Sequence, residues 1–283
     1  MRLRMALYRR RRALAEFPAN WKRERALVQL GRREMPLLAE ARRKHEAEYA
    51  KFNNPLVSVV INTYSRGQLL AERTLPAVFE QTHQNLEVVV VGDCCPDDTP
   101  ERMAQIKDPR LRFHNLPERG KYPENPQERW FVAGTAPANH ALRIAKGQWI
   151  AHLDDDDVLT PTYLEDMLKR AYETDAELVY AQSHFEATPG VWRMDGSPNF
   201  PSGRWPHRGE AIAHSAVMFR SYLRFFEYDI NAYKYKRAGD MWLWFRMKRA
   251  GVRTAMLPKI GVLRPLRPDQ IPQTQAAPAA VAS

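Results

Sequence analysis

The most distinctive chemical feature of the sequence is a run of four aspartates, Asp154 to Asp157, directly after the apolar segment 148–153. Adjacent carboxylates repel one another, so such a run is tolerated only on a solvated surface or around a cation. Carboxylate oxygens suit Mg²⁺ or Mn²⁺, and Mg²⁺ characteristically binds one or two carboxylates together with substrate phosphates. An acidic cap on the helix that Pro161 opens is the alternative, but it explains one aspartate better than four.

A separate carboxylate, Asp240, follows Gly239 at the start of a helix-like segment, 241–246. Aspartate is a favoured residue at helix starts, so a purely structural role is one interpretation. The other is a general base, which removes the proton of an attacking hydroxyl. The residues around Asp240 leave both interpretations open.

Short apolar, β-branched runs alternate with helix-like segments along the main part of the chain. The expected strands are 56–61, 86–91, 111–114, 148–153 and 178–181, and the expected helices are 68–81, 99–106, 136–145 and 161–173. This alternation predicts an α/β fold with a mostly parallel sheet. Open α/β sheets bind ligands outside the carboxyl ends of their strands, which is where the aspartate run falls.

The first 54 residues carry nearly all of the net charge of +10, because they hold 15 Lys and Arg against 6 Asp and Glu. They favour helix, and Pro18 and Pro36 predict a division into two or three short helices. Leu3, Leu7 and Leu14 lie near a cluster of arginines, a pattern that suits an anionic membrane surface or an acidic partner. A solvated helix packed on the main domain fits the same residues equally well.

The end of this segment is expected to dock on the core of the main domain. Its apolar and aromatic residues recur at three- and four-residue spacings, which place them on one helical face. These residues are Leu38, Ala41, His45, Tyr49 and Phe52.

Composition excludes several classes of protein. Hydrophobic residues make up 44% and charged residues 27% of the 283, which excludes a collagen-like or wholly disordered chain. The two cysteines, Cys94 and Cys95, are adjacent, so a disulfide-stapled scaffold is excluded and a reducing, cytoplasmic compartment is predicted. No run approaches the ~18 apolar residues of a membrane span, and the first residues lack the apolar core and cleavage site of a secretory signal.

A series of ordered motifs between Pro55 and Pro268 resembles family 2 glycosyltransferases of GT-A fold, which move a sugar from a nucleotide diphosphate to an acceptor. The motifs are PLVSVVINTYS at 55–65, VVGD at 90–93, the segment 138–147 that begins Ala-Asn, LDDDDVLTP at 153–161 and GDMWLWFR at 239–246. The resemblance implies a three-layer α/β/α, Rossmann-like domain with a mostly parallel central sheet, preceded by a helical extension.

The resemblance also implies which residues bind the donor. Thr63 and Tyr64 would approach the base and ribose, and Asp93 falls on the aspartate that hydrogen-bonds uracil. Asn139 belongs to a further donor-binding motif, and the nucleotide sugar would be UDP-linked.

In the aspartate run, the resemblance makes Asp156 the ligand of Mn²⁺ or Mg²⁺, while Asp154 and Asp155 would serve the ribose and the hydration shell of the ion. It makes Asp240 the general base. The implied reaction is metal-dependent transfer with inversion of the anomeric centre, in which the cation neutralises the departing diphosphate.

Charge and composition predict a basic helical extension (1–54) and a disordered tail (269–283). Between them, the resemblance implies a nucleotide-sugar-binding half (55–157) and an acceptor-binding half (158–268). The expected partners are a nucleotide sugar and a glycan, lipid-linked or other hydroxyl acceptor. Through residues 1–54 the protein would meet an anionic membrane at its cytoplasmic face, whereas nucleic acid is a less favoured partner.

Two other functions are alternatives to a glycosyltransferase. A sugar-phosphate nucleotidyltransferase needs a glycine-rich loop after its first strand, but 62–67 offers only Gly67. The second rival is an inactive scaffold whose basic first segment binds anionic membrane or nucleic acid.

The remaining polar and aromatic residues of the second half carry less information. His184, His207 and His214 lack metal-ligand spacing and are interpreted as structural residues. Trp192 and Trp205 lie in an expected irregular loop, 188–209, and are interpreted as core residues in preference to sugar-stacking ones.

Overall fold

The computed structural model describes the backbone of residues 2–196, 198–201 and 211–271, and side chains from Asn20 onward. Trp205, His207 and most of the predicted disordered tail, residues 272–283, lie outside the described residues.

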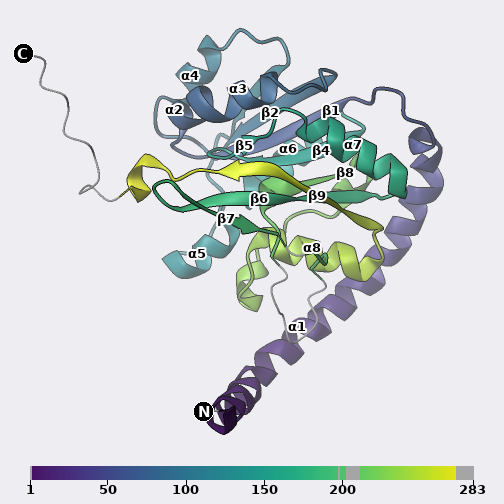
Figure 1. The fold of residues 1–283 in the computed structure, drawn as a ribbon, viewed down its shortest axis with the longest axis vertical. Coiled ribbons are helices and arrows are strands. Elements are labelled where there is room, and N and C mark those ends of the chain that lie inside the picture. The colour runs from purple at the N-terminus through teal and green to yellow at the C-terminus, as the bar shows by residue number, and fades with distance from the viewer. Residues whose placement is uncertain (1, 197, 202–210, 272–283) are drawn as a thin grey trace, which may run out of the picture.

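Nine strands, counted within the described residues, form one curled sheet in the order β3-β2-β1-β4-β8-β6-β9-β5, with β7 paired to β6 (Figure 1). The strands are β1 Val57–Thr63, β2 Leu86–Gly92, β3 Leu111–Asn115, β4 Trp149–Asp154, β5 Val158–Leu159, β6 Leu178–Thr188, β7 Val191–Asp195, β8 Val217–Arg220 and β9 Thr254–Arg264. The β3-β2-β1-β4 half is entirely parallel, as the β-α-β alternation predicts, and β6 is parallel to β9.

Strands β1 and β2 explain the valine-rich runs of the sequence. All seven residues of β2 are buried, and in β1 only Asn62 is not. A strand covered on both faces has no water-facing position, so it reads as a continuous apolar run and not as an alternating one.

The predicted loop 188–209 was wrong in its first part, where β6 continues to Thr188 and forms a hairpin with β7. Most side chains of this hairpin are exposed or half-buried, so it lacks the apolar run by which the other strands were found. Trp192 on β7 is 39% exposed, and its predicted place in the core was also wrong.

Helices cover both faces of the sheet. They are α2 Gly67–Leu69 and α3 Leu75–Phe79, joined by a π-helical segment Leu70–Thr74, then α4 Thr99–Gln105, α5 Pro126–Val132, α6 Thr135–Ile144, α7 Tyr163–Thr174 and α8 Gly239–Ala250. Ala181 of β6 lies beside Tyr163 of α7, whereas the neighbouring Tyr180 packs on Phe200, which contacts Trp244 of α8. Successive strand residues point to opposite faces, so α7 and α8 sandwich the sheet.

The basic extension is one helix, α1 Arg2–His45, followed by a 3₁₀ turn Glu46–Tyr49, so the predicted division into short helices was wrong. Pro18 and Pro36 lie inside α1 without ending it. A proline inside a helix costs about 3 kcal/mol. Packing against the domain offsets this cost: α1 lies along α8 and buries Leu27 and Leu38 (Figure 1).

Two buried ion pairs fix the orientation of α1 on the domain. Glu34 accepts hydrogen bonds from Arg246 of α8. Glu177, whose side chain is inaccessible to solvent, accepts bonds of 2.6 and 2.7 Å from Arg42 and one of 2.7 Å from Tyr222. Removing one partner of such a pair is costly because the other charge stays buried.

The predicted docking face of the extension is confirmed for most of its members. Leu38 and Tyr49 are buried, Ala41 packs against the core and His45 stacks on Tyr222. Phe52 is 57% exposed but meets Tyr172 edge to face. Among the described residues, no helix combines the length and the apolar character needed to span a bilayer.

Candidate functional site

The register of the parallel strands gathers the predicted donor-site residues at one edge of the sheet. Asn62 is paired with Asp154 across β1 and β4, and Thr63 with Gly92 across β1 and β2. Because parallel strands end at the same edge, residues 63–64, Asp93 and the aspartate run meet there, as the sequence predicts.

A cavity of about 580 Å³ opens at this edge. The predicted residues among its lining are Thr63, Tyr64, Asp93, Asp154, Asp155 and Asp156. Its lining also contains four arginines that sequence reasoning did not assign to the site: Arg66, Arg119, Arg264 and Arg267.

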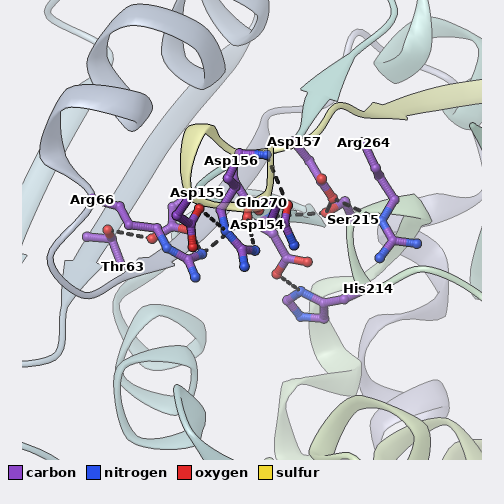
Figure 2. Close-up of polar contacts among 12 residues, drawn as sticks. Thr63, Arg66, Asp154, Asp155, Asp156, Asp157, His214, Ser215, Arg264 and Gln270 are labelled. Atoms are coloured by element: carbon purple, nitrogen blue, oxygen red, sulfur yellow. Dashed lines mark hydrogen bonds and ion pairs between the residues drawn. The ribbon is translucent and has the colours of Figure 1, made fainter. Parts of the chain in front are cut away.

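The two middle aspartates of the run, Asp155 and Asp156, accept hydrogen bonds from arginines (Figure 2). Asp155 is buried and accepts bonds of 2.7 Å from both Thr63 Oγ1 and Arg66 Nη1. Burial raises the pKa of Asp155 to about 6, although Arg66 opposes the shift. Asp156 accepts bonds on Oδ2 from Arg66, at 3.3 Å, and from Arg267, at 3.0 Å.

The outer two aspartates have different partners. Asp157 is buried and accepts a 2.6 Å bond from Ser215, and burial together with the charge of Asp154 raises its pKa. Asp154 Oδ1 lies 2.8 Å from His214 Nδ1. Burial disfavours the ionised form of Asp154, but the charge and hydrogen bond of His214 hold its pKa below the ordinary value.

The sequence predicted that the aspartate run lies either on a solvated surface or around a cation, but the structure shows a third arrangement. Asp155 and Asp157 are buried, and arginine and hydroxyl groups supply the hydrogen bonds that burial requires. Mutual repulsion is relieved by nearby positive charge and, at Asp157, by a raised pKa that favours the neutral carboxyl.

Tyr64 and Asp93 also line this cavity. The guanidinium carbon of Arg119 lies 3.9 Å from the centre of the Tyr64 ring. Asp93 is only 3% exposed and accepts a 2.9 Å bond from the backbone N–H of Gly120. Asp93 thus also fixes the loop that carries Arg119, a role that the motif did not indicate.

Asn139 does not lie among the described residues that line this cavity or the one next to it. Its amide instead makes two bonds with the backbone of Tyr228, donating to the carbonyl at 2.9 Å and accepting from the N–H at 2.7 Å. These bonds tie α6 to the segment that precedes α8, and the donor contact of Asn139 stays a prediction.

Asp240 lies in the first turn of α8 and lines a second cavity of about 170 Å³. It is half-buried, and burial raises its pKa although His214 opposes the shift. Its Oδ1 accepts a 2.6 Å bond from the N–H of Met241, but the helix begins one residue earlier, at Gly239. Asp240 is therefore not the cap of α8, which was its structural interpretation.

The two cavities adjoin one another. Their shared lining residues are Asn62, Trp130, Ala133, Gly134 and Asp154. Gly134, in the left-handed region at φ 85°, makes the turn between α5 and α6, and a Cβ there would lie 2.8 Å from the Asn62 amide. A side chain at this position would be strained by the backbone conformation and would press on Asn62, which lines both cavities.

His214 is a site residue that sequence reasoning missed. Its Nδ1 faces Asp154 and its Nε2 lies 2.7 Å from the Tyr228 hydroxyl, which in turn lies 3.2 Å from His152 Nδ1. Burial lowers the pKa of His214, but the charges of Asp154 and Asp240 outweigh it and raise the pKa overall. No local motif indicates such a residue, because its partners, Asp154 of β4 and Tyr228, come from other segments of the chain.

The donor set around Asp156 suits a divalent cation only in part. Carboxylates are the hard ligands that Mn²⁺ and Mg²⁺ prefer, and both arginine bonds to Asp156 fall on one oxygen. Over the described portion of the chain, however, no group of three or more acidic, His or Cys side chains is placed to hold a metal. A cation at Asp156 fits if substrate phosphates supply further ligands, which is the usual mode of Mg²⁺.

Comparison with known proteins places these features in a family. Residues 58–230 match the model of glycosyl transferase family 2. The succinoglycan biosynthesis protein ExoO of Rhizobium meliloti is 33% identical over 44% of this chain and 32% of its own length. The glucosyltransferase WfaP of Escherichia coli, named for UDP-Glc and α-D-GlcNAc-diphosphoundecaprenol, is 32% identical over 40% of each chain. The chain thus spans about a third to two fifths of these relatives.

Solved structures share the fold. TarS residues 1–349 from S. aureus, in complex with UDP-GlcNAc, superimposes with a TM-score of 0.56 at 19% identity, over 75% of this chain and 58% of that one. Mannosyltransferase PcManGT from Pyrobaculum calidifontis, in complex with GDP-Man and Mn²⁺, gives 0.52 at 17% identity, over 91% and 69%. Both support the predicted GT-A fold. With the family model covering more than half of its length, this chain belongs to glycosyl transferase family 2.

Proposed function

We propose that the protein transfers a sugar from a nucleotide diphosphate, preferably UDP, to an acceptor hydroxyl with inversion of the anomeric centre. One observation supports this most strongly: the aspartate- and arginine-lined cavity adjoins a smaller cavity that contains Asp240, and Asp154 lines both. A donor in the first cavity would present its anomeric carbon to an acceptor in the second.

In this mechanism Asp240 accepts the proton of the acceptor hydroxyl as the oxygen attacks the anomeric carbon. Its raised pKa makes it a stronger base than an ordinary aspartate. Inversion requires attack and departure on opposite faces of the anomeric carbon, and the placement of Asp240 and the diphosphate site in two adjoining cavities is compatible with that arrangement. Arg66 and Arg267, which pair with Asp156, lie where they can also approach the diphosphate.

Asp156 would hold Mn²⁺ or Mg²⁺. When bound, the cation supplies positive charge against the charge that builds up on the leaving diphosphate. The UDP preference is supported by the motif around Asp93 and by the ligand named for TarS, while PcManGT is named with GDP-Man. The Tyr64–Arg119 stack offers an aromatic surface for the base.

The test is a panel of nucleotide sugars with the purified full chain. We expect hydrolysis or transfer from at least one UDP-sugar in the presence of Mn²⁺ or Mg²⁺, and weaker use of GDP-sugars. Product analysis by NMR gives the anomeric configuration. Failure of every nucleotide sugar to bind or react would overturn the proposed function, and retention of configuration would overturn the inverting mechanism.

We also propose that α1 rests on an anionic membrane at the cytoplasmic face. Trp21, Val28 and Met35 are exposed at seven-residue intervals on α1, with the exposed Arg25 and Arg32 between them. Arg25 lies over the Trp21 ring at 5.5 Å. Apolar and basic groups on one helical face suit a surface of acidic lipid. The undecaprenol-linked acceptor named for WfaP supports a membrane location.

The full chain should sediment with vesicles of phosphatidylcholine and phosphatidylglycerol but not with phosphatidylcholine alone. At about 1 kcal/mol per basic residue, the double variant Arg25→Glu, Arg32→Glu should weaken binding at least about tenfold. Lys107→Glu with Lys121→Glu, two exposed lysines outside α1, is the matched control. Equal losses in both double variants would point to net charge instead of this helical face.

A further inference from the structure

Trp130 has an exposure that packing does not explain. Of the tryptophans whose side chains are described, Trp149, Trp242 and Trp244 are fully buried, but Trp130 is 71% exposed, more than Trp21 or Trp192. Its neighbours on α5 are anchored. Val132 is fully buried in a small apolar cluster with Trp242 and Phe245, and Phe131 packs against this cluster. The ring of Phe131 meets that of Trp130 edge to face, with centroids 5.3 Å apart. Trp130 is therefore an exposed aromatic surface on a fixed support.

Trp130 lies at the junction of the two cavities, because it lines both. Phe131, beside it, lines only the smaller cavity, which contains Asp240. In the larger cavity, Tyr64 already offers an aromatic surface for the nucleotide base. These positions associate Trp130 with the molecule that reacts at Asp240.

The chemistry of the smaller cavity limits what that molecule is. Its polar lining groups include Asp154, Asp240, His214 and Tyr228, and none of the described residues that line it is Lys or Arg. Two carboxylates, with the His214 imidazole as their basic neighbour and no Lys or Arg in the described lining, disfavour a phosphate or carboxylate at this point. They suit a neutral group with several hydroxyls, and the aromatic rim suits a group with an apolar face. A pyranose ring has both, since its C–H bonds form an apolar face and its hydroxyls lie around the edge.

We propose that Trp130 is the stacking surface for the sugar ring of the acceptor, so that the acceptor is a glycoside whose terminal pyranose carries the attacking hydroxyl. This inference rests on the proposed transferase function and names its acceptor class. The pyranose face lies on the indole of Trp130 while one hydroxyl points toward Asp240. Any phosphate or lipid attached to that sugar lies outside the smaller cavity.

The experiment measures binding directly, with the full chain saturated with UDP. Saturation-transfer NMR is recorded with methyl β-glucoside, methyl β-galactoside and methyl N-acetyl-β-glucosaminide, and with sorbitol as an acyclic polyol. We expect transfer to the ring C–H protons of at least one glycoside and none to sorbitol. Trp130→Ala should weaken that binding at least about tenfold, as for an aromatic anchor, whereas Trp130→Phe retains most of it.

Trp21→Ala is the matched control, because Trp21 is exposed on α1 and lines neither cavity. Its glycoside binding should equal that of the wild type. The affinity for UDP, measured by calorimetry, should be the same in all variants, and circular dichroism should show the same fold.

The outcomes separate the two proposals. Absence of glycoside binding by the wild type, or unchanged binding by Trp130→Ala, overturns the stacking role. A loss of UDP affinity in Trp130→Ala assigns the ring to the donor and also overturns it. Absence of UDP or UDP-sugar binding by the wild type itself counts against the proposed function, whatever the glycosides do.

Discussion

The Asp240→Asn variant is expected to lose at least about 10²-fold in kcat while its affinity for the nucleotide sugar stays within about twofold of wild type. Asparagine has nearly the same shape as aspartate and can still accept the bond from the Met241 N–H, so the start of α8 is preserved. It cannot accept a proton from the acceptor hydroxyl. The loss therefore falls on the chemical step and not on donor binding.

Steady-state kinetics with a saturating donor, together with calorimetric donor binding, measure the two quantities. Asp98→Asn is a suitable control, because Asp98 is an exposed aspartate that pairs with Arg102 and lines neither cavity of the candidate site. If Asp240→Asn turned over at close to the wild-type rate, Asp240 would be removed from the mechanism.

The pH dependence provides a second measure of the same role. A general base must be ionised, so kcat/KM falls as the pH drops through the pKa of Asp240. Burial raises that pKa, so the acid limb should lie above the ordinary value of about 3.9 for aspartate. The charge of His214 lowers the pKa of Asp240, so His214→Gln should move the limb to still higher pH.

Features that depend on the local sequence pattern, such as the buried strands, could be predicted from the sequence. The buried strands β1, β2 and β4 appear as apolar runs because water reaches neither face, and their common direction carries the aspartates to one edge. Thr63 and Asp154 could therefore be placed at the site without knowledge of any long-range contact.

Features that depend on distant partners could not be predicted in this way. Arg66 reaches the aspartates from the start of α2, and Arg264 and Arg267 reach them from the end of β9, so neither segment is near the aspartate run in the sequence and no local spacing marks these arginines. The continuity of α1 has the same origin, because contacts with Arg246 and Glu177 outweigh the local effect of its prolines. Propensity is a weak prior that tertiary packing overrides.

The Asp156→Asn variant should lose activity at least about 10²-fold, because a bound cation contributes several kcal/mol to stabilising the leaving diphosphate. In contrast to Asp240→Asn, it should also lose Mn²⁺ affinity. That affinity is measured by titrating Mn²⁺ in the presence of UDP and following the titration by electron paramagnetic resonance.

The wild type should lose activity in chelator and regain it with Mn²⁺ or Mg²⁺. Asp157→Asn should be milder, because the raised pKa of Asp157 already favours its neutral form.

The arginines around Asp156 make the opposite outcome equally informative. Arg66 and Arg267 both bond Asp156, so Asp156→Asn removes a negative charge next to two arginines beside the diphosphate site, although Arg66 keeps its 2.7 Å bond to Asp155. If wild-type activity survived chelation and Asp156→Asn kept its rate, these arginines would be the source of the positive charge and the metal proposal would fail. Arg267→Gln would then produce the large loss in rate. If chelation abolishes activity, the arginines serve to position Asp156, and Arg267→Gln should mainly weaken Mn²⁺ binding.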